Sequence, residues 1–340
     1  MRNISQYIYK SKHGLWNIPR YLCIYGETMS HIIDLHLLSL ITQRSSSMSG
    51  TQLKNIIADR VNIFYREAGS SDAPTLLLLH GFPSSSHQYR NLIHLLSKKY
   101  HILAPDLPGF GFTEIPESRH YKYTFDSLTT SIESFLSELK VEKYSIYIFD
   151  YGAPVGLRLA LRHPDAIQSI ISQNGNAYTE GLGEFWAPFK TMWATKTPSE
   201  LAASRESLKS LTSLDSTKWQ YVTGTPSSNL HKIAPESYTL DHALLSRPGN
   251  TDIQLDLFYD YRTNLDFYPQ FQKFFRETNV PILAVWAKND QIFVPAGAEG
   301  FKRDSGNLVV QFLDAGHFAL ETNVEEIADA ILRFGEKFGV

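Results

Sequence analysis

Three residues whose side chains could support nucleophilic catalysis each follow an apolar segment of the 340-residue chain. Asp150 comes directly after the run YSIYIF, Asp290 after ILAVWAKN, and His317 after LVVQFLDAG. A carboxylate can form a covalent bond to an electrophilic carbon, and a histidine that a second carboxylate orients can activate water. The order nucleophile, acid, histidine is one that known catalytic triads use. Together the three residues suggest catalysis through a covalent enzyme intermediate.

The residues around Asp150 are typical of a sharp turn between a strand and a helix. Such a turn exposes its central side chain above a sheet, and small residues after it let the helix pack closely. Gly152 and Ala153 meet this requirement, whereas Ile148 is bulkier than the pattern favours. Pro154 suits the first turn of a helix, where a missing backbone N–H has no cost. The segment therefore predicts a nucleophile elbow centred on Asp150.

Each of the three residues also has a simpler explanation when it is considered alone. An Asp at a strand end more often caps a helix than attacks a substrate, Asp290 could be an ordinary loop residue, and a single His is more often structural. Their occurrence in catalytic order at three strand ends favours catalysis, because open α/β sheets bind their ligands at the carboxyl ends of strands.

The elements that would position these residues alternate between strands and helices from about residue 56 onward. The alternation predicts βαβ units, and hence an α/β fold with a mostly parallel, doubly wound sheet. Strands are expected at residues 61–67, 75–79, 101–104, 144–149, 166–172, 281–286 and 308–313. Helical periodicity is found at residues 92–96, 125–139 and 324–338, and a further helix is expected from the Asp150 turn to about residue 161.

Residues 174–278 have a different character, because strand patterns give way to helical stretches rich in Trp, Tyr and Phe. We therefore expect an α/β core formed by residues 50–173 and 279–340, with residues 174–278 inserted as a helical lid. An aromatic lid suits an apolar pocket.

Composition argues against several other classes of function. The net charge is only −3, with 32 Lys+Arg against 35 Asp+Glu, so nucleic acid is not an expected partner. A single cysteine, Cys23, excludes an internal disulfide and indicates no zinc cluster. We expect neither a metal nor another cofactor. The expected partners are a small apolar organic substrate and water, and the oligomeric state stays open.

Residues 1–49 are expected to be an N-terminal extension outside the core. Up to Gly26 they contain basic but no acidic residues, which fits a mitochondrial targeting segment, an irregular extension, or a start codon upstream of Met48. The low cysteine content favours a reducing, cytoplasmic location, with mitochondrial targeting as the alternative. The apolar run from His31 to Ile41 is interrupted and shorter than the about 18 residues of a membrane span, so no span is expected.

As a set, the motifs of this chain resemble those of the epoxide hydrolase and haloalkane dehalogenase branch of the α/β-hydrolases. They are H-G-F-P from His80, D-L-P-G-F-G from Asp106, D-Y-G from Asp150, N-D ending at Asp290 and G-H-F around His317. The resemblance covers about residues 50–340 and implies the α/β-hydrolase fold with a helical lid.

The resemblance also implies a mechanism in two steps. Asp150 would open an epoxide or displace halide at an sp³ carbon, giving an alkyl ester of the enzyme. Water activated by His317, with Asp290 orienting the imidazole, would then hydrolyse this ester. The backbone N–H groups of Phe82 and Tyr151 would form the oxyanion hole, with a cis peptide bond after Phe82.

The nature of the leaving group separates two activities within this branch. Halide release commonly uses a Trp after the nucleophile and an Asn elsewhere, but the corresponding residues here are Tyr151 and Phe82. Epoxide opening uses lid tyrosines as acids. Tyr261, in a Y-R pair late in the lid, is the first candidate, with Tyr178 or Tyr221 as its partner.

The leading hypothesis is a cofactor-independent hydrolase that adds water to an epoxide or a similar strained or activated sp³ carbon electrophile. C–halogen hydrolysis is the alternative activity, and a non-catalytic ligand-binding member of the fold is the alternative outside enzymes. Ordinary ester hydrolysis is disfavoured by the carboxylate nucleophile. Phe149 and Tyr151 depart from epoxide hydrolases, where His and Trp are usual. Trp186 is expected to line an apolar pocket rather than to bind halide.

Several polar residues near these motifs are expected to be structural. His80 and Asp106 would hold loops beside the site through hydrogen bonds. Glu321 would cap or complement the start of the last helix. The run Ser84–Ser86 lies at a helix start, which fits capping better than a serine nucleophile.

Overall fold

The computed structural model describes residues 50–340, so the expectations for residues 1–49, Cys23 included, lie outside the described residues. Within this range eight strands form one sheet in the order β1-β2-β4-β3-β5-β6-β7-β8. β2 pairs antiparallel with β1 and β4, and all other neighbouring strands are parallel. The prediction of a mostly parallel, doubly wound α/β sheet is confirmed.

The bounds of the elements follow the expected alternation. The strands are β1 (Gln52–Ala58), β2 (Val61–Ala68), β3 (Thr75–Leu79), β4 (His101–Pro105), β5 (Tyr144–Phe149), β6 (Ile167–Gln173), β7 (Ile282–Ala287) and β8 (Leu308–Leu313). The main helices outside the β6–β7 connection are α2 (Arg90–Leu96), α3 (Phe125–Glu138), α4 (Gly152–Arg162), α11 (Ala296–Gly300) and α12 (Val324–Phe338). The connection itself holds α5 (Ala187–Trp193), α6 (Pro198–Leu208), α7 (Leu214–Val222), α8 (Pro235–Leu245), α9 (Asn250–Asp260) and α10 (Arg262–Thr278).

Strand β1 is the one strand of this sheet that the sequence did not predict. It lies at the edge of the sheet and pairs only with β2. Leu53 and Ile57 are 61% and 63% exposed, and Ala58 is its only fully buried residue. Because such an edge strand is mostly solvent-exposed, its sequence lacks the continuous apolar run that marks β5 and β7.

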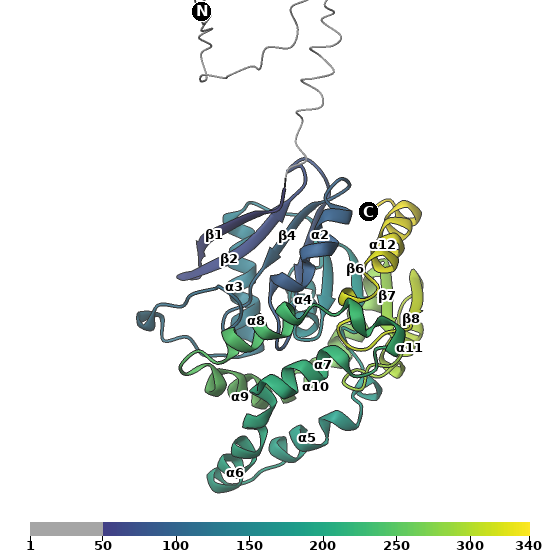
Figure 1. Ribbon diagram of the computed structural model, residues 1–340. Coiled ribbons are helices and arrows are strands. Elements are labelled where there is room, and N and C mark those ends of the chain that lie inside the picture. The colour runs from purple at the N-terminus through teal and green to yellow at the C-terminus, as the bar shows by residue number, and fades with distance from the viewer. Residues whose placement is uncertain (1–49) are drawn as a thin grey trace, which may run out of the picture. The chain divides into compact units, whose positions relative to one another are not determined.

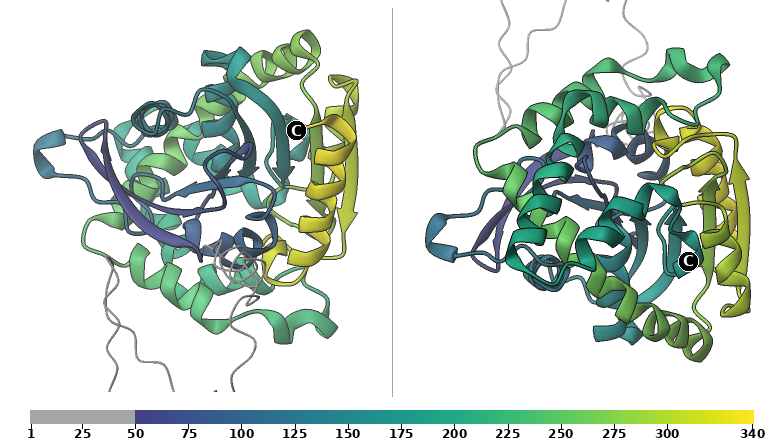
Figure 2. Two further views of the ribbon diagram at one scale, coloured as in Figure 1. Left: turned by 90° about the horizontal axis from the view of Figure 1, so that it is seen from above. Right: turned by 90° about the horizontal axis from the view of Figure 1, so that it is seen from below.

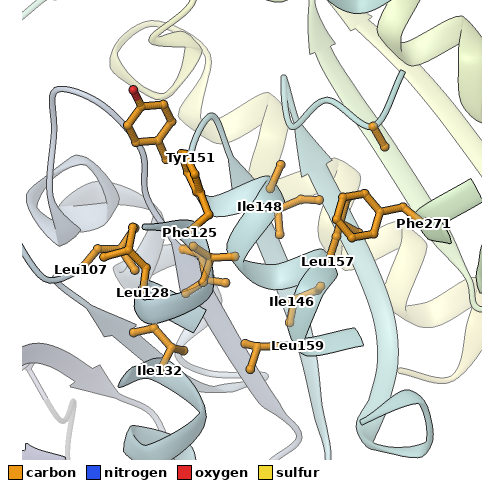
Figure 3. Close-up of a cluster of buried hydrophobic side chains, with 14 of the residues drawn as sticks. Leu107, Phe125, Leu128, Ile132, Ile146, Ile148, Tyr151, Leu157, Leu159 and Phe271 are labelled. Atoms are coloured by element: carbon orange, nitrogen blue, oxygen red, sulfur yellow. The ribbon is translucent and has the colours of Figure 1, made fainter. Parts of the chain in front are cut away.

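Helices cover both faces of the sheet (Figure 1). α3 and α4 contact each other on one face, and α2 and α12 contact each other on the other. Figure 3 shows part of the first layer, in which apolar side chains of α3, α4 and β5 form one cluster. Leu128, Ile132, Leu157, Leu159, Ile146 and Ile148 are among its members. This packing fixes α4, the helix that begins directly after Asp150 and Tyr151.

Residues 174–278, between β6 and β7, form a helical insertion. It lies beneath the sheet in the view of Figure 1, and it crosses in front of the sheet when seen from below in the right view of Figure 2. A buried polar cluster attaches it to the core. Ser237 of α8 donates to Glu321, and Arg90 of α2 donates twice to the same carboxylate, at 2.8 and 2.9 Å.

The position of Glu321 corrects one expectation. Glu321 does not cap the last helix, because both of its carboxylate oxygens are paired with Arg90. The side chain is 3% exposed, so the ion pair compensates a buried charge and links α2 to the turn before α12. Ser85, in contrast, caps a short 3-10 helix as expected, by accepting a hydrogen bond from the backbone N–H of His87.

Asp241 of α8 lies in the same region and is 1% exposed. Tyr221 of α7 donates its hydroxyl to Asp241 Oδ2 at 2.5 Å, and Asp241 Oδ1 has no hydrogen-bond partner within residues 50–340. Burial raises the pKa of Asp241 to about 8. A carboxyl group with this environment is protonated in the folded protein at pH values where it would ionise in the unfolded chain.

This difference predicts a specific pH dependence of stability. Because the pKa of Asp241 is higher in the folded protein than the about 4 expected after unfolding, stability falls as pH rises from about 4 to about 8. Asp241→Asn removes this dependence. The free energy of unfolding of the variant should therefore rise relative to wild type between about pH 5 and pH 8, measured by urea denaturation. The exposed Asp329→Asn on α12 is the matched control, and a constant difference for Asp241→Asn would contradict the assignment.

Candidate active site

Asp150 lies at a sharp turn between β5 and α4, as the sequence predicted. Its backbone φ is +48°, in the left-handed region that non-glycine residues seldom adopt. The backbone segments around this turn pack so closely that glycine is required at two positions, one at the start of α4 and one in the loop after β3. A Cβ atom on Gly152 would lie 2.0 Å from the carbonyl oxygen of Leu79, and one on Gly81 would lie 2.2 Å from Asp150 Oδ1. This local backbone geometry is the one found at nucleophile elbows.

One oxygen of the Asp150 carboxylate accepts two backbone hydrogen bonds. Oδ1 lies 2.6 Å from the backbone nitrogen of Phe82 and 2.7 Å from that of Tyr151. These are the two N–H groups that the resemblance implied for the oxyanion hole, and the Phe82–Pro83 peptide bond is cis, as it also implied. His80 and Asp106 hold the neighbouring loops in place, since they accept hydrogen bonds from backbone N–H groups of those loops.

The charge state of Asp150 follows from these contacts. The residue is 4% exposed, and burial raises its pKa to about 6. The nearby imidazole of His317 and the N–H groups of Phe82 and Tyr151 act in the opposite direction, because they favour the carboxylate form, while Asp290 adds a small further increase. With a pKa near 6 the group is mostly ionised at neutral pH, which a nucleophile requires.

His317 lies between the two carboxylates. Its Nδ1 is 2.7 Å from Asp290 Oδ2, and its Nε2 is 4.0 Å from Asp150 Oδ2. Burial alone would lower the pKa of His317, but the carboxylates of Asp290 and Asp150 produce a net increase. With the Nδ1 proton directed at Asp290, Nε2 is left to accept a proton, and no described residue hydrogen-bonds to it. The structure thus brings the three residues together from the ends of β5, β7 and β8.

Asn174 is a site residue that the sequence did not reveal. It follows β6 directly, has a φ of +49°, and donates through Nδ2 to Asp290 Oδ2 at 2.8 Å. Its Oδ1 accepts from the backbone N–H of Ala287 at 2.9 Å, and the N–H of Ile292 donates to Asp290 Oδ1 at 2.7 Å. These bonds orient the acid. The feature of the sequence that could have revealed Asn174 is its position directly after a strand, because Asn tolerates the left-handed conformation.

Aromatic side chains enclose the elbow. Trp186 and Tyr261 of the helical insertion lie with ring centroids 4.3 Å apart, and Tyr261 is 5.9 Å from Tyr151. The Trp186 Nε1 proton is donated to the backbone oxygen of Ile292 at 2.9 Å. Trp186 therefore contributes its apolar ring to this region, in line with its expected role. Phe149, the residue noted above as a departure from epoxide hydrolases, packs against the imidazole of His317 with ring centroids 4.6 Å apart.

The hydroxyl partner of Tyr261 is Tyr268, at 3.3 Å. Asn176 donates its amide to the Tyr268 oxygen at 3.2 Å, so Tyr268 can donate to Tyr261 and leave the Tyr261 proton available. Burial raises the pKa of Tyr268 to about 12 and also raises the pKa of Tyr261. Tyr268 was missed, although its spacing of two helical turns from Tyr261 was a usable signal.

The other two tyrosines named from the sequence have different surroundings. Tyr221 donates to Asp241 and stacks on Phe318 at 3.9 Å, and Tyr178 packs edge-on against Phe301 at 5.1 Å. The structure therefore pairs Tyr261 with Tyr268 and not with Tyr178 or Tyr221. The contacts of Tyr178 and Tyr221 give no support to a leaving-group role, so that role stays a prediction for these two residues.

The carboxylate of Asp150 is largely closed off from solvent, with 6% of its side chain exposed. A narrow crevice, too small to hold a water molecule, is lined by His317 and Asp290 together with Trp219 and Gln220 of α7. A wider surface depression beside Tyr144 lies at the amino end of β5, opposite to Asp150. Across residues 50–340 no set of three or more His, Cys, Asp or Glu side chains could hold a metal ion. In the same range no helix has the length and hydropathy that a membrane crossing needs.

Comparisons with known proteins identify the family. The family model for the alpha/beta hydrolase fold matches residues 74–324. An uncharacterized hydrolase of Saccharomyces cerevisiae is 50% identical over 277 residues, which are 81% of this chain and 94% of that protein. A haloalkane dehalogenase of Mycobacterium marinum is 36% identical over 116 residues, 34% of this chain and 39% of that protein. The structure of epoxide hydrolase CorEH matches with a TM-score of 0.68 at 17% identity, covering 84% of this chain and 99% of that one. The chain belongs to the α/β-hydrolase family and is a hydrolase of that fold.

Proposed function

We propose that the protein opens an epoxide, or a similar strained or activated sp³ carbon electrophile, through an alkyl ester formed on Asp150. The observation that carries the proposal is the environment of the carboxylate. Oδ1 is bound by two backbone N–H groups, and Oδ2 lies 4.0 Å from the imidazole of His317. A serine at this turn would attack an acyl carbon and form an acyl enzyme. A carboxylate instead attacks an sp³ carbon and is itself esterified.

In the first step Oδ2 of Asp150 attacks the substrate carbon and the bond from that carbon to the leaving oxygen breaks. The leaving alkoxide needs a proton, which the Tyr261 hydroxyl supplies. Tyr268 then donates to the phenolate oxygen of Tyr261, and Asn176 donates to Tyr268. Positioned acids of this kind contribute typically about 10²- to 10⁴-fold to the rate.

In the second step water attacks Cγ of the esterified Asp150, and His317 accepts the water proton at Nε2. Asp290 stabilises the imidazolium through its 2.7 Å contact with Nδ1. Negative charge develops on Oδ1, which already lies within hydrogen-bond distance of the Phe82 and Tyr151 N–H groups. Loss of one such donor typically costs about 3 kcal/mol of transition-state stabilisation.

The surroundings of the site favour an oxygen leaving group over a halide. Trp186 and Trp193 of the insertion already donate their indole N–H groups to backbone oxygens, at 2.9 and 2.8 Å. A halide needs such side-chain N–H donors, whereas an alkoxide needs a proton, which Tyr261 can give. The relatives carry both kinds of name, so C–halogen hydrolysis remains the second candidate function.

We further propose that the helical insertion, residues 174–278, acts as a lid over the core of residues 50–173 and 279–340. Trp186 and Tyr261 of the insertion enclose the elbow together with Phe82 and Tyr151. Substrate can reach a carboxylate that is 6% exposed only if part of this aromatic wall moves. The apolar lining selects a small apolar organic substrate, and closure excludes bulk water from the first step.

Replacement of the base should trap the covalent intermediate. In His317→Gln the ester forms but hydrolyses slowly, because no group accepts the water proton. After exposure to an epoxide such as styrene oxide, intact mass spectrometry should show one substrate-sized adduct, and peptide mapping should place it on Asp150. The double variant Asp150→Asn/His317→Gln is the control and should stay unmodified. Full turnover by Asp150→Asn would show that the proposed nucleophile is wrong.

The first step should depend on pH through Asp150. Because burial raises the pKa of this carboxyl to about 6, the nucleophilic form is lost as pH falls through that value. The rate constant for ester formation, measured by rapid quench in a single turnover, should drop about tenfold per pH unit below about pH 6. A rate that stays constant down to pH 4.5 would contradict this assignment.

Removal of the proposed acid should separate the two chemistries. Tyr261→Phe should lower diol formation from an epoxide by about 10²-fold or more and leave halide displacement from an alkyl halide within about twofold, since halide needs no proton. Tyr259→Phe, a neighbouring half-buried tyrosine, is the matched control. Assays of diol formation and halide release on small substrate panels measure the two rates in each variant. Dominant halide release by the wild-type protein would favour the second candidate function instead.

A further inference from the structure

The turn that follows α7 packs directly on the loops that carry the acid and the base. Asn289, next to Asp290, donates its side-chain amide to the backbone oxygen of Gly224 at 2.9 Å. A Cβ atom on Gly316, next to His317, would lie 2.1 Å from the backbone oxygen of Thr223. The segment from Trp219 to Gly224 therefore has a fixed position relative to the base, although it belongs to the helical insertion.

Gln220 lies within this segment and its surroundings are unusual for an amide. The residue is 2% exposed, and its Nε2 is buried without a hydrogen-bond partner anywhere in residues 50–340. Its side chain lines the same crevice as His317 and Asp290. A buried amide without a partner destabilises a protein, so such a group in a native structure requires an explanation.

A second nitrogen in the same state belongs to another residue that lines the crevice. His317 Nε2 is also buried, and none of the residues that the structure describes forms a hydrogen bond to it. The amide of Gln220 is a donor, and the neutral imidazole nitrogen is an acceptor. A single water molecule placed between the two nitrogens would satisfy both, because its oxygen would accept from the amide while one of its hydrogens would be donated to Nε2.

We propose that Gln220 is a positioning residue that holds the hydrolytic water beside His317. The inference rests on the proposed ester mechanism. With the water so held, one lone pair of its oxygen is left for Cγ of Asp150. A bond forms between this oxygen and Cγ, and the proton passes to His317 Nε2. The bond between Cγ and the alkyl oxygen then breaks, and that oxygen takes the proton from His317 to give the alcohol. The second proton of the water, left on the carboxyl group, returns to the Tyr261 phenolate formed in the first step, which restores the carboxylate of Asp150.

In the proposed arrangement, water approaches His317 through this crevice and not along the path of the substrate. Trp219, Thr223 and Gln291 line it together with Gln220, so it reaches His317 from the side of α7 and not past Trp186 and Tyr261. The crevice is too narrow to hold a water molecule as it stands, so the inference requires side chains of its lining to move before water enters.

Substitution of Gln220 tests the inference. Gln220→Leu removes the amide and keeps the apolar volume, and Gln220→Met is a second variant in case Leu perturbs the packing. Rapid quench with a single epoxide substrate resolves ester formation from ester hydrolysis. We expect ester formation within about twofold of wild type and hydrolysis slowed by about 10-fold or more, so that the ester accumulates at steady state. Gln270→Leu, an exposed amide on α10 that is not part of the crevice lining, is the control and should leave both steps unchanged.

Thermal unfolding separates a positioning role from a structural one. Because the amide of Gln220 lacks a partner, the apolar variants should unfold at the same temperature as wild type or higher. Unchanged hydrolysis in both variants, or an equal slowing of both steps, would overturn the inference. The proposed function is judged separately by His317→Gln. If that variant forms no ester the mechanism itself fails, and if it does while Gln220→Leu hydrolyses normally, only the role of Gln220 fails.

Discussion

The site depends on one constraint, which is that the carboxylate of Asp150 is buried and must be compensated. A charge that is 4% exposed is strongly unfavourable unless polar groups surround it. The compensation comes from two backbone N–H groups on Oδ1 and from the imidazole near Oδ2. Both N–H groups reach Oδ1 only because the chain turns sharply at Asp150 and passes close to it at Gly81. The contact between β3 and β5 in the middle of the sheet brings these two turns together.

The same burial links the fold to the proposed chemistry. Aromatic side chains of the helical insertion exclude water from the carboxylate, which strengthens its interactions with the N–H groups and with His317. The insertion is also fixed to the core on the side of the base, through the contacts of the turn after α7 with the loops around Asn289 and Gly316. In the proposed mechanism, a substrate carbon meets Asp150 on the aromatic side of the site, and water meets His317 on the side of Gln220.

Sequence patterns predicted the parts of this arrangement that short segments determine. The strands around Asp150 are continuous apolar runs, and Asp150 lies in a turn recognisable from its own neighbours in the chain. Phe82 and Tyr151 were implied by the family resemblance of short motifs. Tyr268 and Gln220 could not be recognised in this way, because their roles depend on how helices of the insertion pack against one another and against the core. Asn174 and Glu321 depend in the same way on distant partners, Asp290 and Arg90. The exposed edge strand β1 was missed because little of it is buried.

The most direct test of the account is a single turnover in water labelled with oxygen-18, with the enzyme in excess over an epoxide. If water attacks Cγ of an esterified Asp150, the label enters the carboxylate of the enzyme and the first product molecule receives an unlabelled oxygen from Asp150. Mass spectrometry of the product and of the peptide containing Asp150 reads both positions. Label in the product with none in Asp150 would mean that water attacks the substrate directly, and the covalent mechanism would be wrong.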